Sequence, residues 1–336
     1  MGKVIIRTEA LQIEEYDDAW VTPGAQRILN VYDKNGNFVP FTSKRRFGKE
    51  EYSIPETPMK FDDSKVGYYN EEVIYIGFLR GHWGHFMVDS SVRLWALERP
   101  ECADKRILVT IEGMAEFYNK LFKYLKIDKS RILQLDGTAK FRKVLVPELS
   151  YFPGKYVSKE FLTPYKKVAN SVYLDKPKYE KIYLSRVHFA KGKKELGEKQ
   201  IEVIFEMNGY HILYPEELSY EEQVWYYKNC KIMAATNGTI AHNIVYADDG
   251  SKLIILNRYK EDNIHQNAIN LIKDLDVKYI DAYYRNSNRE NCLMERTSDV
   301  CEFCKEEGML LPPESIFMKA YLLLIFKLPY LYRWFN

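Results

Sequence analysis

The sequence predicts an α/β protein with two domains and an apolar helical tail. Strand and helix patterns alternate twice along the chain, a Pro-containing connection separates the two series, and residues 316–335 are strongly apolar. The length of 336 residues agrees with about two domains. We expect an N-terminal domain over residues 1–155, a second domain over 156–290 and a tail over 291–336.

The first series begins with a hairpin predicted over residues 25–42, because Asn35-Gly36 supplies the positive φ angles of a tight turn. Short apolar runs then predict strands, and apolar residues at three- and four-residue intervals predict helices. The strands are expected at 73–78, 106–110, 131–135 and 143–146, and the helices at 84–98 and 112–126. This β-α-β order is typical of a parallel sheet covered by helices.

The second series follows a connection expected at about residues 147–178. Its predicted strands are 181–185, 210–214, 231–235 and 253–256, its predicted helices are 198–208 and 219–229, and a turn with a helix start is expected at 236–246. Ser219 with Glu222 three residues later predicts a capping box at the start of the second helix.

Composition excludes some function classes. The net charge is +2, from 49 basic and 47 acidic residues, so the chain does not look like a nucleic-acid binder. Five cysteines and no secretion signal at the start indicate a reduced, cytosolic protein. Cys301 and Cys304 have zinc-ligand spacing, and Cys292 would be a third ligand, but no second pair follows them. We expect Asp274-Leu275-Asp276 to be a solvated turn and not a metal motif.

The first polar motif runs from Gly81 to Asp89 and continues to Arg93. It lies where a predicted strand gives way to a helix, the end of a strand at which α/β sheets bind ligands. His85, Asp89 and Arg93 are four residues apart, which places them along one face of a regular helix. They offer a base, its orienting partner and an anion clamp. An exposed polar stripe with ordinary ion pairs is the alternative.

Two further motifs follow strands of the second series. Arg186 comes just after the strand at 181–185, from where it can reach a diphosphate. Residues 236–243 contain a turn centred on Gly238 and a helix start, which together predict an anion site made by backbone N–H groups and the helix dipole. A surface ion pair and a plain strand–helix turn are the respective alternatives.

Gly84-His85-Phe86 with Asp89 and Arg93 resembles the early motif of glycosyltransferase family 61. Three further segments resemble the same family in the same order: Tyr183-Leu184-Ser185-Arg186, Pro215-Glu216-Glu217-Leu218-Ser219 with Glu222-Gln223, and Asn237-Gly238-Thr239 through Asn243. The resemblance spans roughly residues 25–260. It implies a GT-B fold of two Rossmann-like domains facing across a cleft, an inverting mechanism, a UDP-sugar donor and no required metal.

The resemblance also gives the candidate residues their roles. The catalytic base is His85 or Asp89, and the residues leave that choice open. The diphosphate is expected at Arg186 and the backbone of Gly238-Thr239, with Glu216 or Glu217 for the ribose hydroxyls. Asn237 and Asn243 complete the donor side, and the remaining residues expected in the cleft are His82, Gly84 and Arg93. Capsular or envelope polysaccharide intermediates are the expected acceptors.

The chain departs from the family pattern at two places. Members usually have His-Gly where this chain has Asn237-Gly238, and a second basic residue with Asn-Glu where it has Lys193-Lys194 and Gly197-Glu198. Asn237 favours an alternative function, a catalytically inactive protein that binds glycans or sugar nucleotides. A different two-domain nucleotide enzyme is a third hypothesis, although no GxGxxG motif supports a dinucleotide enzyme.

The apolar tail predicts contact with a membrane surface. Residues 316–335 are numerous enough to span a bilayer, but Lys319, Lys327 and Pro329 interrupt the run. Apolar bulk with Lys, Arg, Trp and Tyr is typical of an interfacial segment that binds anionic lipid. We therefore expect a cytoplasmic protein that is peripheral at the inner face of the cell membrane. A final helix packed on the core is the alternative.

Overall fold

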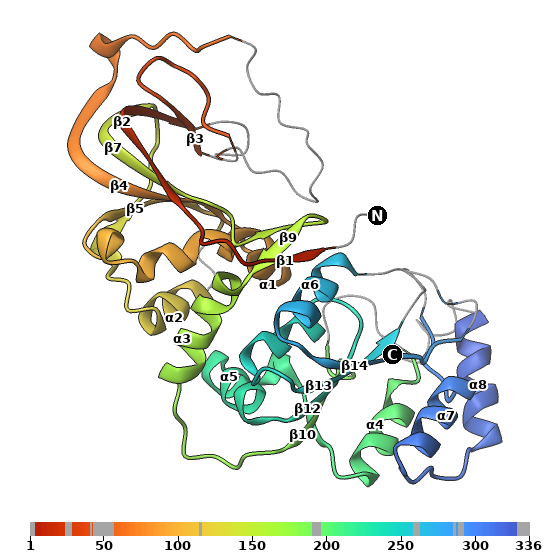
Figure 1. Cartoon of the computed structure of the whole chain (residues 1–336). Helices are drawn as coiled ribbons and strands as arrows, with labels where there is room; N and C mark the ends of the chain where they lie inside the picture. Colours follow the sequence, from red (N-terminus) through yellow and green to blue (C-terminus); the bar gives the residue numbers. More distant parts are fainter. Residues whose placement is uncertain are drawn as a thin grey trace. The chain divides into compact units, whose positions relative to one another are not determined.

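The protein is a mixed α/β chain, as the sequence predicts, and Figure 1 shows its computed structural model. The structure describes residues 4–23, 29–40, 42, 57–113, 116–189, 196–257, 263–284, 287 and 292–327. The chain divides into two units, Met1–Ser171 and Val172–Asn336, and each is considered by itself. The predicted domain limits at 155 and 290, and the predicted GT-B arrangement, stay predictions.

Unit 1 is built on a mixed six-stranded sheet with the order β3-β2-β7-β4-β5-β6. Its strands are β2 (Ile13–Pro23), β3 (Leu29–Tyr32), β4 (Gly67–Leu79), β5 (Arg106–Ile111), β6 (Ile132–Leu133) and β7 (Ala139–Pro147). β4 pairs in parallel with both β5 and β7, while β2 is antiparallel to β7 and β3. The predicted parallel pairing is confirmed for β4, β5, β6 and β7, and β2 with β3 extends the sheet by antiparallel strands that the β-α-β series did not include.

A second, small sheet in unit 1 has the order β1-β9-β8. It joins β1 (Ile5–Arg7) to β8 (Tyr151–Phe152) and β9 (Tyr156–Ser158). The helical segments of this unit are η3 (Asp63–Lys65), α1 (Trp83–His85), η4 (Phe86–Ser90), η5 (Ser91–Glu98), η6 (Pro100–Cys102), α2 (Glu116–Tyr124), η7 (Lys129–Arg131), η8 (Lys159–Leu162) and α3 (Thr163–Ser171). Strands β2, β3, β4, β5 and β7 contribute most of one buried apolar core.

Unit 2 contains a fully parallel five-stranded sheet with the order β11-β10-β12-β13-β14. The strands are β10 (Lys181–Leu184), β11 (His211–Leu213), β12 (Ile232–Thr236), β13 (Lys252–Asn257) and β14 (Asp276–Asp281). In chain order this is 2-1-3-4-5, so the direction of winding reverses between β10 and β12. Ligands of open α/β sheets bind outside the carboxyl ends of the strands at such a reversal.

Helices cover both faces of this sheet (Figure 1). They are α4 (Glu198–Met207), η9 (Pro215–Glu217), α5 (Tyr220–Asn229), η10 (Ala241–Tyr246), α6 (Ile264–Ile272), α7 (Ser298–Glu306) and α8 (Ile316–Lys327). α4 and α7 share one buried core with side chains of β10, β12, β13 and β14, whereas η10 contacts both α5 and α6. The predicted capping box at Ser219 and Glu222 is present at the start of α5.

Among the described residues, no helix is long and apolar enough to cross a membrane. α8 has twelve residues, and the remaining residues of the apolar tail, 328–336, lie outside the described part of the chain.

Candidate functional site

The carboxyl ends of β10 and β12 bring two of the predicted motifs together within unit 2. Leu184 of β10 pairs with Ala235 of β12, so the residues that follow these two strands leave the sheet side by side. One of these segments contains Arg186, and the other contains Asn237-Gly238-Thr239. The two donor-side motifs predicted from the sequence therefore meet at the winding reversal of the sheet.

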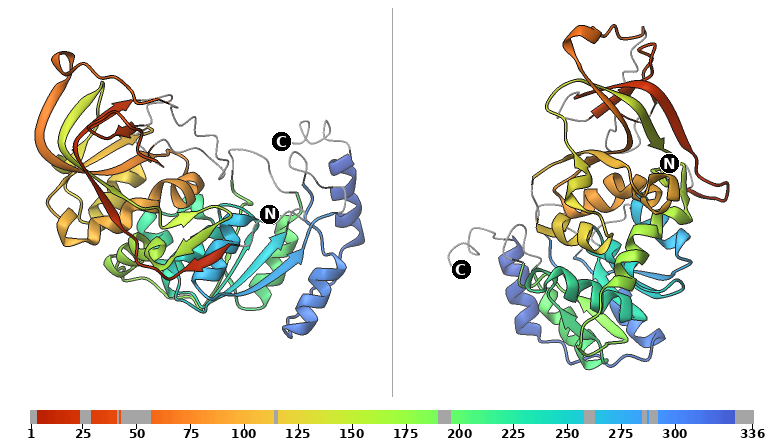
Figure 2. Two further views of the ribbon diagram at one scale, coloured as in Figure 1. Left: turned by 45° about the horizontal axis from the view of Figure 1, so that its top comes forward. Right: turned by 90° about the vertical axis from the view of Figure 1, so that its left-hand side faces the viewer.

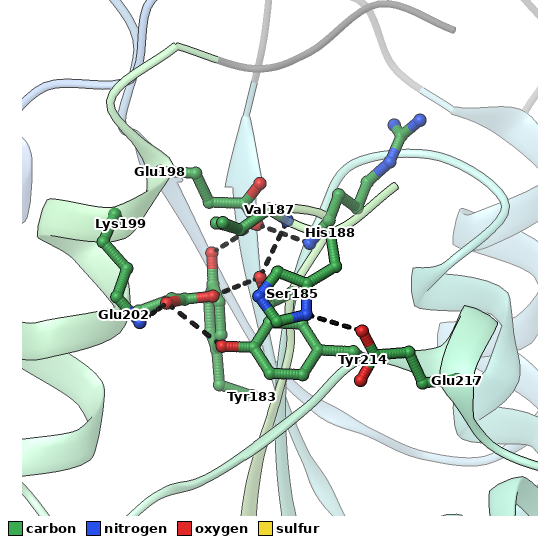
Figure 3. A network of polar contacts seen from close by, with 10 residues as sticks. Tyr183, Ser185, Val187, His188, Glu198, Lys199, Glu202, Tyr214 and Glu217 are labelled. Atoms are coloured by element: carbon green, nitrogen blue, oxygen red, sulfur yellow. Dashed lines mark hydrogen bonds and ion pairs between the residues drawn. The ribbon is translucent and has the colours of Figure 1, made fainter. Parts of the chain in front are cut away.

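Two carboxylates of α4 hold the turn that follows β10 (Figure 3). Oε1 of Glu198 accepts hydrogen bonds from the backbone N–H of Arg186 and from the hydroxyl of Tyr183, both at 3.0 Å. Glu202, four residues later, accepts a hydrogen bond from the hydroxyl of Ser185. These two side chains fix the backbone around Arg186 at the end of the sheet. The guanidinium group of Arg186 lies over the ring of Phe189.

The two carboxylates differ in their surroundings. Glu202 is fully buried, and its second oxygen lies 2.6 Å from the ammonium nitrogen of Lys199. Burial raises the pKa of Glu198 to about 7 and the charge of Glu202 adds to this, while hydrogen bonds from Arg186 and Tyr183 act in the opposite direction. A carboxyl group that is partly neutral at pH 7 can lie beside an anion at less electrostatic cost than an ionised one.

Polar atoms at this edge remain without partners in the described part of the chain. They are Oε2 of Glu198 and Oγ1 of Thr236, which are both buried, and the backbone N–H groups of Gly238 and Thr239. Buried polar atoms are nearly always hydrogen-bonded, and an exception at a strand end is a candidate ligand contact. Gly238 has φ +129 and nothing within 4 Å of the position where a Cβ would lie.

His188 and the acidic pair after β11 lie at the same edge. The ring of His188 stacks on Tyr214 with centroids 3.8 Å apart, and its Nδ1 lies 2.6 Å from Oε1 of Glu217 (Figure 3). Glu216 and Glu217 are exposed on η9. The sequence offered no role for His188, because a single histidine after a strand carries no spacing signal.

The predicted helix start is a six-residue 3-10 helix, η10. The N–H groups of Ala241 and His242 donate to the carbonyls of Gly238 and Thr239, as the internal bonds of a 3-10 helix do. The contribution of a helix dipole to the anion site stays a prediction. The side-chain amide of Asn243 donates to the carbonyl of Ile240. Of the backbone N–H groups predicted at the anion site, those of Gly238 and Thr239 remain.

Asn237 takes part in a contact between neighbouring strands. Its backbone N–H donates to Leu256, and its side-chain amide donates to Oδ1 of Asn257, 2.9 Å away. Asn257 is the last residue of β13, so this bond joins the ends of β12 and β13. The side chain of Asn237 therefore holds the turn before Gly238.

In unit 1 the first motif follows β4, as predicted. His82 is exposed at the start of α1, Gly84 is buried, and the rings of His82 and His85 lie 4.7 Å apart. Asp89 is buried with 7% exposure. Burial and then the charge of Asp89 raise the pKa of Tyr151 well above its usual value.

The predicted regular helix over 84–98 is wrong in its geometry. The segment is a short α-helix, a π-helix over Phe86–Ser90 and a 3-10 helix over Ser91–Glu98. Tertiary donors take carbonyls that a regular helix would use: Tyr165 binds Met87, and Ser150 binds Val92. The four-residue spacing of His85, Asp89 and Arg93 therefore does not give a straight stripe. π-helical turns are frequent at functional sites.

Arg93 lies inside unit 1. It is 2% exposed, its Nε donates to the carbonyl of Pro147 at 2.9 Å, and its guanidinium lies over the ring of Tyr75. These contacts tie the irregular helix to the end of β7. The observed position of Arg93 is therefore that of a buried cross-link between two elements.

Comparison with known families decides the class of this protein. The model of the family described as Glycosyltransferase 61 matches residues 83–254, which is half of the chain. The chain belongs to glycosyltransferase family 61. No curated protein matches it.

The matched region of the glycosyltransferase begins within the motif after β4 and ends within β13, so it includes the candidate site residues of both units except His82. Sequence reasoning missed three buried side chains at the donor-side edge, those of Thr236, Glu198 and Glu202. It also missed the hydrogen bonds by which Glu198 holds the backbone of Arg186. The sequence does contain one signal for the buried carboxylates. One face of α4 carries two acids together with two apolar residues: Glu198, Ile201, Glu202 and Phe205. A pair of acids on the apolar face of a helix indicates buried carboxylates with fixed partners.

Gly197 explains one departure from the family pattern. It has φ +81, and a Cβ at this position would lie 2.2 Å from the carbonyl oxygen of Met294. Residues 196 and 293 form a parallel bridge, so the later segment lies directly against the start of α4. Asparagine tolerates a positive φ but brings a Cβ, so only glycine fits beside Glu198 here.

Among the described residues, no three His, Cys, Asp or Glu side chains converge as a metal site requires. Cys292 and Cys304 are buried and Cys301 is partly exposed. Asp274 and Asp276 lie at the turn between α6 and β14, where Asp274 has φ +51.

Proposed function

We propose that this glycosyltransferase moves a sugar from a UDP-sugar to a growing capsular or envelope polysaccharide intermediate, with inversion at the anomeric carbon. The reaction needs no metal ion and takes place in the cytoplasm at the inner face of the cell membrane. The donor binds at the carboxyl ends of β10 and β12, and the acceptor is activated by the motif after β4.

The observation that supports the donor assignment is the pairing of β10 with β12, which places the segment of Arg186 beside the segment of Gly238 and Thr239 at the winding reversal of unit 2. A cationic fork and two N–H donors are the groups that a diphosphate requires. Nearby, Thr236 and Glu198 each present a buried oxygen without a described partner. Glu216 and Glu217 are exposed acceptors on η9 and are assigned to the ribose hydroxyls.

The mechanism is a direct displacement. His85 or Asp89 takes the proton of the acceptor hydroxyl, the hydroxyl oxygen forms a bond to the anomeric carbon, and the bond from that carbon to the diphosphate breaks. The leaving UDP carries the bonding electron pair and is stabilised by Arg186 and the two backbone donors. If His85 is the base, Asp89 orients its ring.

The first experiment measures UDP release from a panel of UDP-sugars with a lipid-linked acceptor. We expect His85→Ala and Asp89→Asn each to lower the transfer rate by about 10²- to 10⁴-fold, the usual contribution of a general base. UDP affinity, measured by calorimetry, stays within a few-fold of wild type, because both residues belong to unit 1. Asp274→Asn, in the turn between α6 and β14, is the matched control and keeps full activity.

Wild-type rates in both variants would overturn the assignment of the base. A chelator should leave the rate unchanged, and a rate that recovers only on adding a divalent ion would refute the metal-independent mechanism. Retention of the anomeric configuration in the product, determined by NMR, would refute inversion. UDP binding without turnover of any donor would favour the inactive sugar-nucleotide-binding alternative.

A further inference from the structure

Helix α8 carries a cluster of exposed apolar side chains. The exposed fractions are 80% for Ile316 and 90% for Phe317, and about half for Met318, Tyr321 and Leu324. Five such residues lie on one helix of twelve, whereas other exposed apolar side chains of the described chain are distributed over many elements. A contiguous exposed apolar surface of this kind marks an interaction site.

The opposite side of α8 packs on its own unit. Ile325 and Phe326 are buried, and the ring of Phe326 lies edge-on to Tyr284 with centroids 5.4 Å apart. Ser315 accepts a hydrogen bond from the N–H of Met318 and so begins the helix. In both views of Figure 2, α8 (dark blue) lies on the outside of unit 2. The helix is therefore held by one edge while its apolar face points to solvent.

From Ser315 onward the sequence carries only basic charges, and Glu314 comes just before it. Residues 315–336 contain Lys319, Lys327 and Arg333 and no acidic residue. Lys327 is exposed at the end of α8, and Lys319 is partly exposed and paired with Glu314 before the helix. The sequence after α8 adds Tyr330, Tyr332 and Trp334. Large apolar side chains flanked by basic and amphipathic aromatic residues are the composition of a membrane-surface segment.

We propose that the exposed face of α8 docks this protein on the surface of an anionic bilayer. Phe317, Tyr321 and Leu324, at spacings of four and three residues, enter the boundary between headgroups and acyl chains. Lys327, exposed at the end of the helix, meets the lipid phosphates. This docking does not depend on the identity of the donor sugar.

Charge favours lipid over a second copy of this chain. Pairing two α8 helices through their apolar faces would supply no opposite charge for Lys327, because the helix itself carries no acidic residue. An anionic headgroup layer supplies the opposite charge along the whole helix, and the acyl region accepts the apolar side chains without a specific shape.

The test is sedimentation of the full chain with phosphatidylcholine vesicles, with and without phosphatidylglycerol. We expect binding only with the anionic lipid, weakening as salt is added. The triple variant Phe317→Ser, Tyr321→Ser, Leu324→Ser should bind at least about a hundredfold more weakly. Full burial of one large apolar side chain contributes about tenfold or more to the binding constant, and these three side chains are buried only in part. Lys327→Gln should weaken binding by about fivefold.

The matched control removes three exposed apolar side chains elsewhere, Tyr68→Ser, Met207→Ser and Leu271→Ser, and should keep wild-type binding. UDP affinity, measured in every variant, shows that unit 2 is folded. Failure of the wild-type chain to sediment with anionic vesicles would overturn the proposal. So would equal binding by the α8 variant and the control, or a dimer in ultracentrifugation that dissociates only in the α8 variant.

Discussion

At the scale of single residues, Glu198 is the side chain most sensitive to pH. Burial raises its pKa to about 7 from an ordinary value of 4.5. Between these values the folded protein binds a proton that the unfolded chain has released, so this group makes the protein less stable as pH rises. Below pH 4.5 both states are protonated and the effect is absent, and above pH 7 the full cost remains.

Replacing Glu198 by Gln should remove this pH dependence. The glutamine keeps an oxygen for the N–H of Arg186 and the hydroxyl of Tyr183, and its amide group adds a cost that does not vary with pH. We expect the free energy of unfolding of E198Q, relative to wild type, to rise by about 2.5 kcal/mol between pH 5 and pH 8. Urea unfolding at the two pH values measures this difference.

His211 and His242 have pKa values lowered by burial, His242 to about 4, and they stabilise the protein as pH rises through part of the same range. Because wild type and E198Q both contain these histidines, the histidine contribution to the free energy of unfolding cancels in the comparison. A relative stability that stays flat from pH 5 to pH 8 would show that Glu198 is ionised throughout.

At the scale of elements, alanine substitutions of the glycines at the two ends of α4 compare a closely packed position with an open one. Gly197 and Gly209 both have positive φ, but an added Cβ meets the carbonyl of Met294 at 2.2 Å in the first case and nothing within 4 Å in the second. We expect Gly197→Ala to cost about 2–5 kcal/mol of unfolding free energy, from backbone strain and overpacking together. Gly209→Ala should cost about 1–2 kcal/mol, from strain alone.

Chemical denaturation of both variants measures the difference. Equal costs would mean that the segment around Met294 moves away from α4 easily. In that case Gly197→Asn should also be tolerated, and the departure from the family's Asn-Glu pair would have no steric basis.

How much the sequence predicted depends on how local the deciding contacts are. β10, β12 and β13 were predicted because each is a short buried apolar run with helices between. β2 was missed, since its partner β7 lies more than a hundred residues away and its exposed face is rich in acidic residues. The π-helix and the 3-10 helix after β4 were also missed, because their carbonyls bind donors far away in the sequence: Tyr165 binds Met87 in the first and Ser150 binds Val92 in the second.

The same distinction applies to the site. Arg186 and Gly238 were predicted from their places after strands, which is local information. The buried state of Glu202 and the open oxygen of Thr236 depend on how α4 and the strands pack, which the sequence does not state. The pairing of β10 with β12 was likewise unpredicted, although it is what brings the two donor-side motifs together.

At the scale of the whole molecule, each unit contains an apolar core built from its own described residues. The core of unit 1 is drawn from residues between Ala19 and Val146, and that of unit 2 from residues between Tyr183 and Cys304. The start of unit 2 is fixed within its own unit, because Lys228 binds the carbonyl of Val172 and the indole of Trp225 donates to Pro177. A fragment that begins at Val172 should therefore fold without unit 1.

This fragment, residues 172–336, tests whether unit 2 alone binds UDP and whether sugar transfer also requires unit 1. All proposed donor contacts lie in unit 2, so the fragment should bind UDP within about tenfold of the full chain, a difference of less than about 1.4 kcal/mol. It should transfer no sugar, because His85 and Asp89 belong to unit 1. Calorimetric titration with UDP and the UDP-release assay measure the two properties. A folded fragment, identified by its circular dichroism, that binds UDP much more weakly would mean that unit 1 contributes donor contacts.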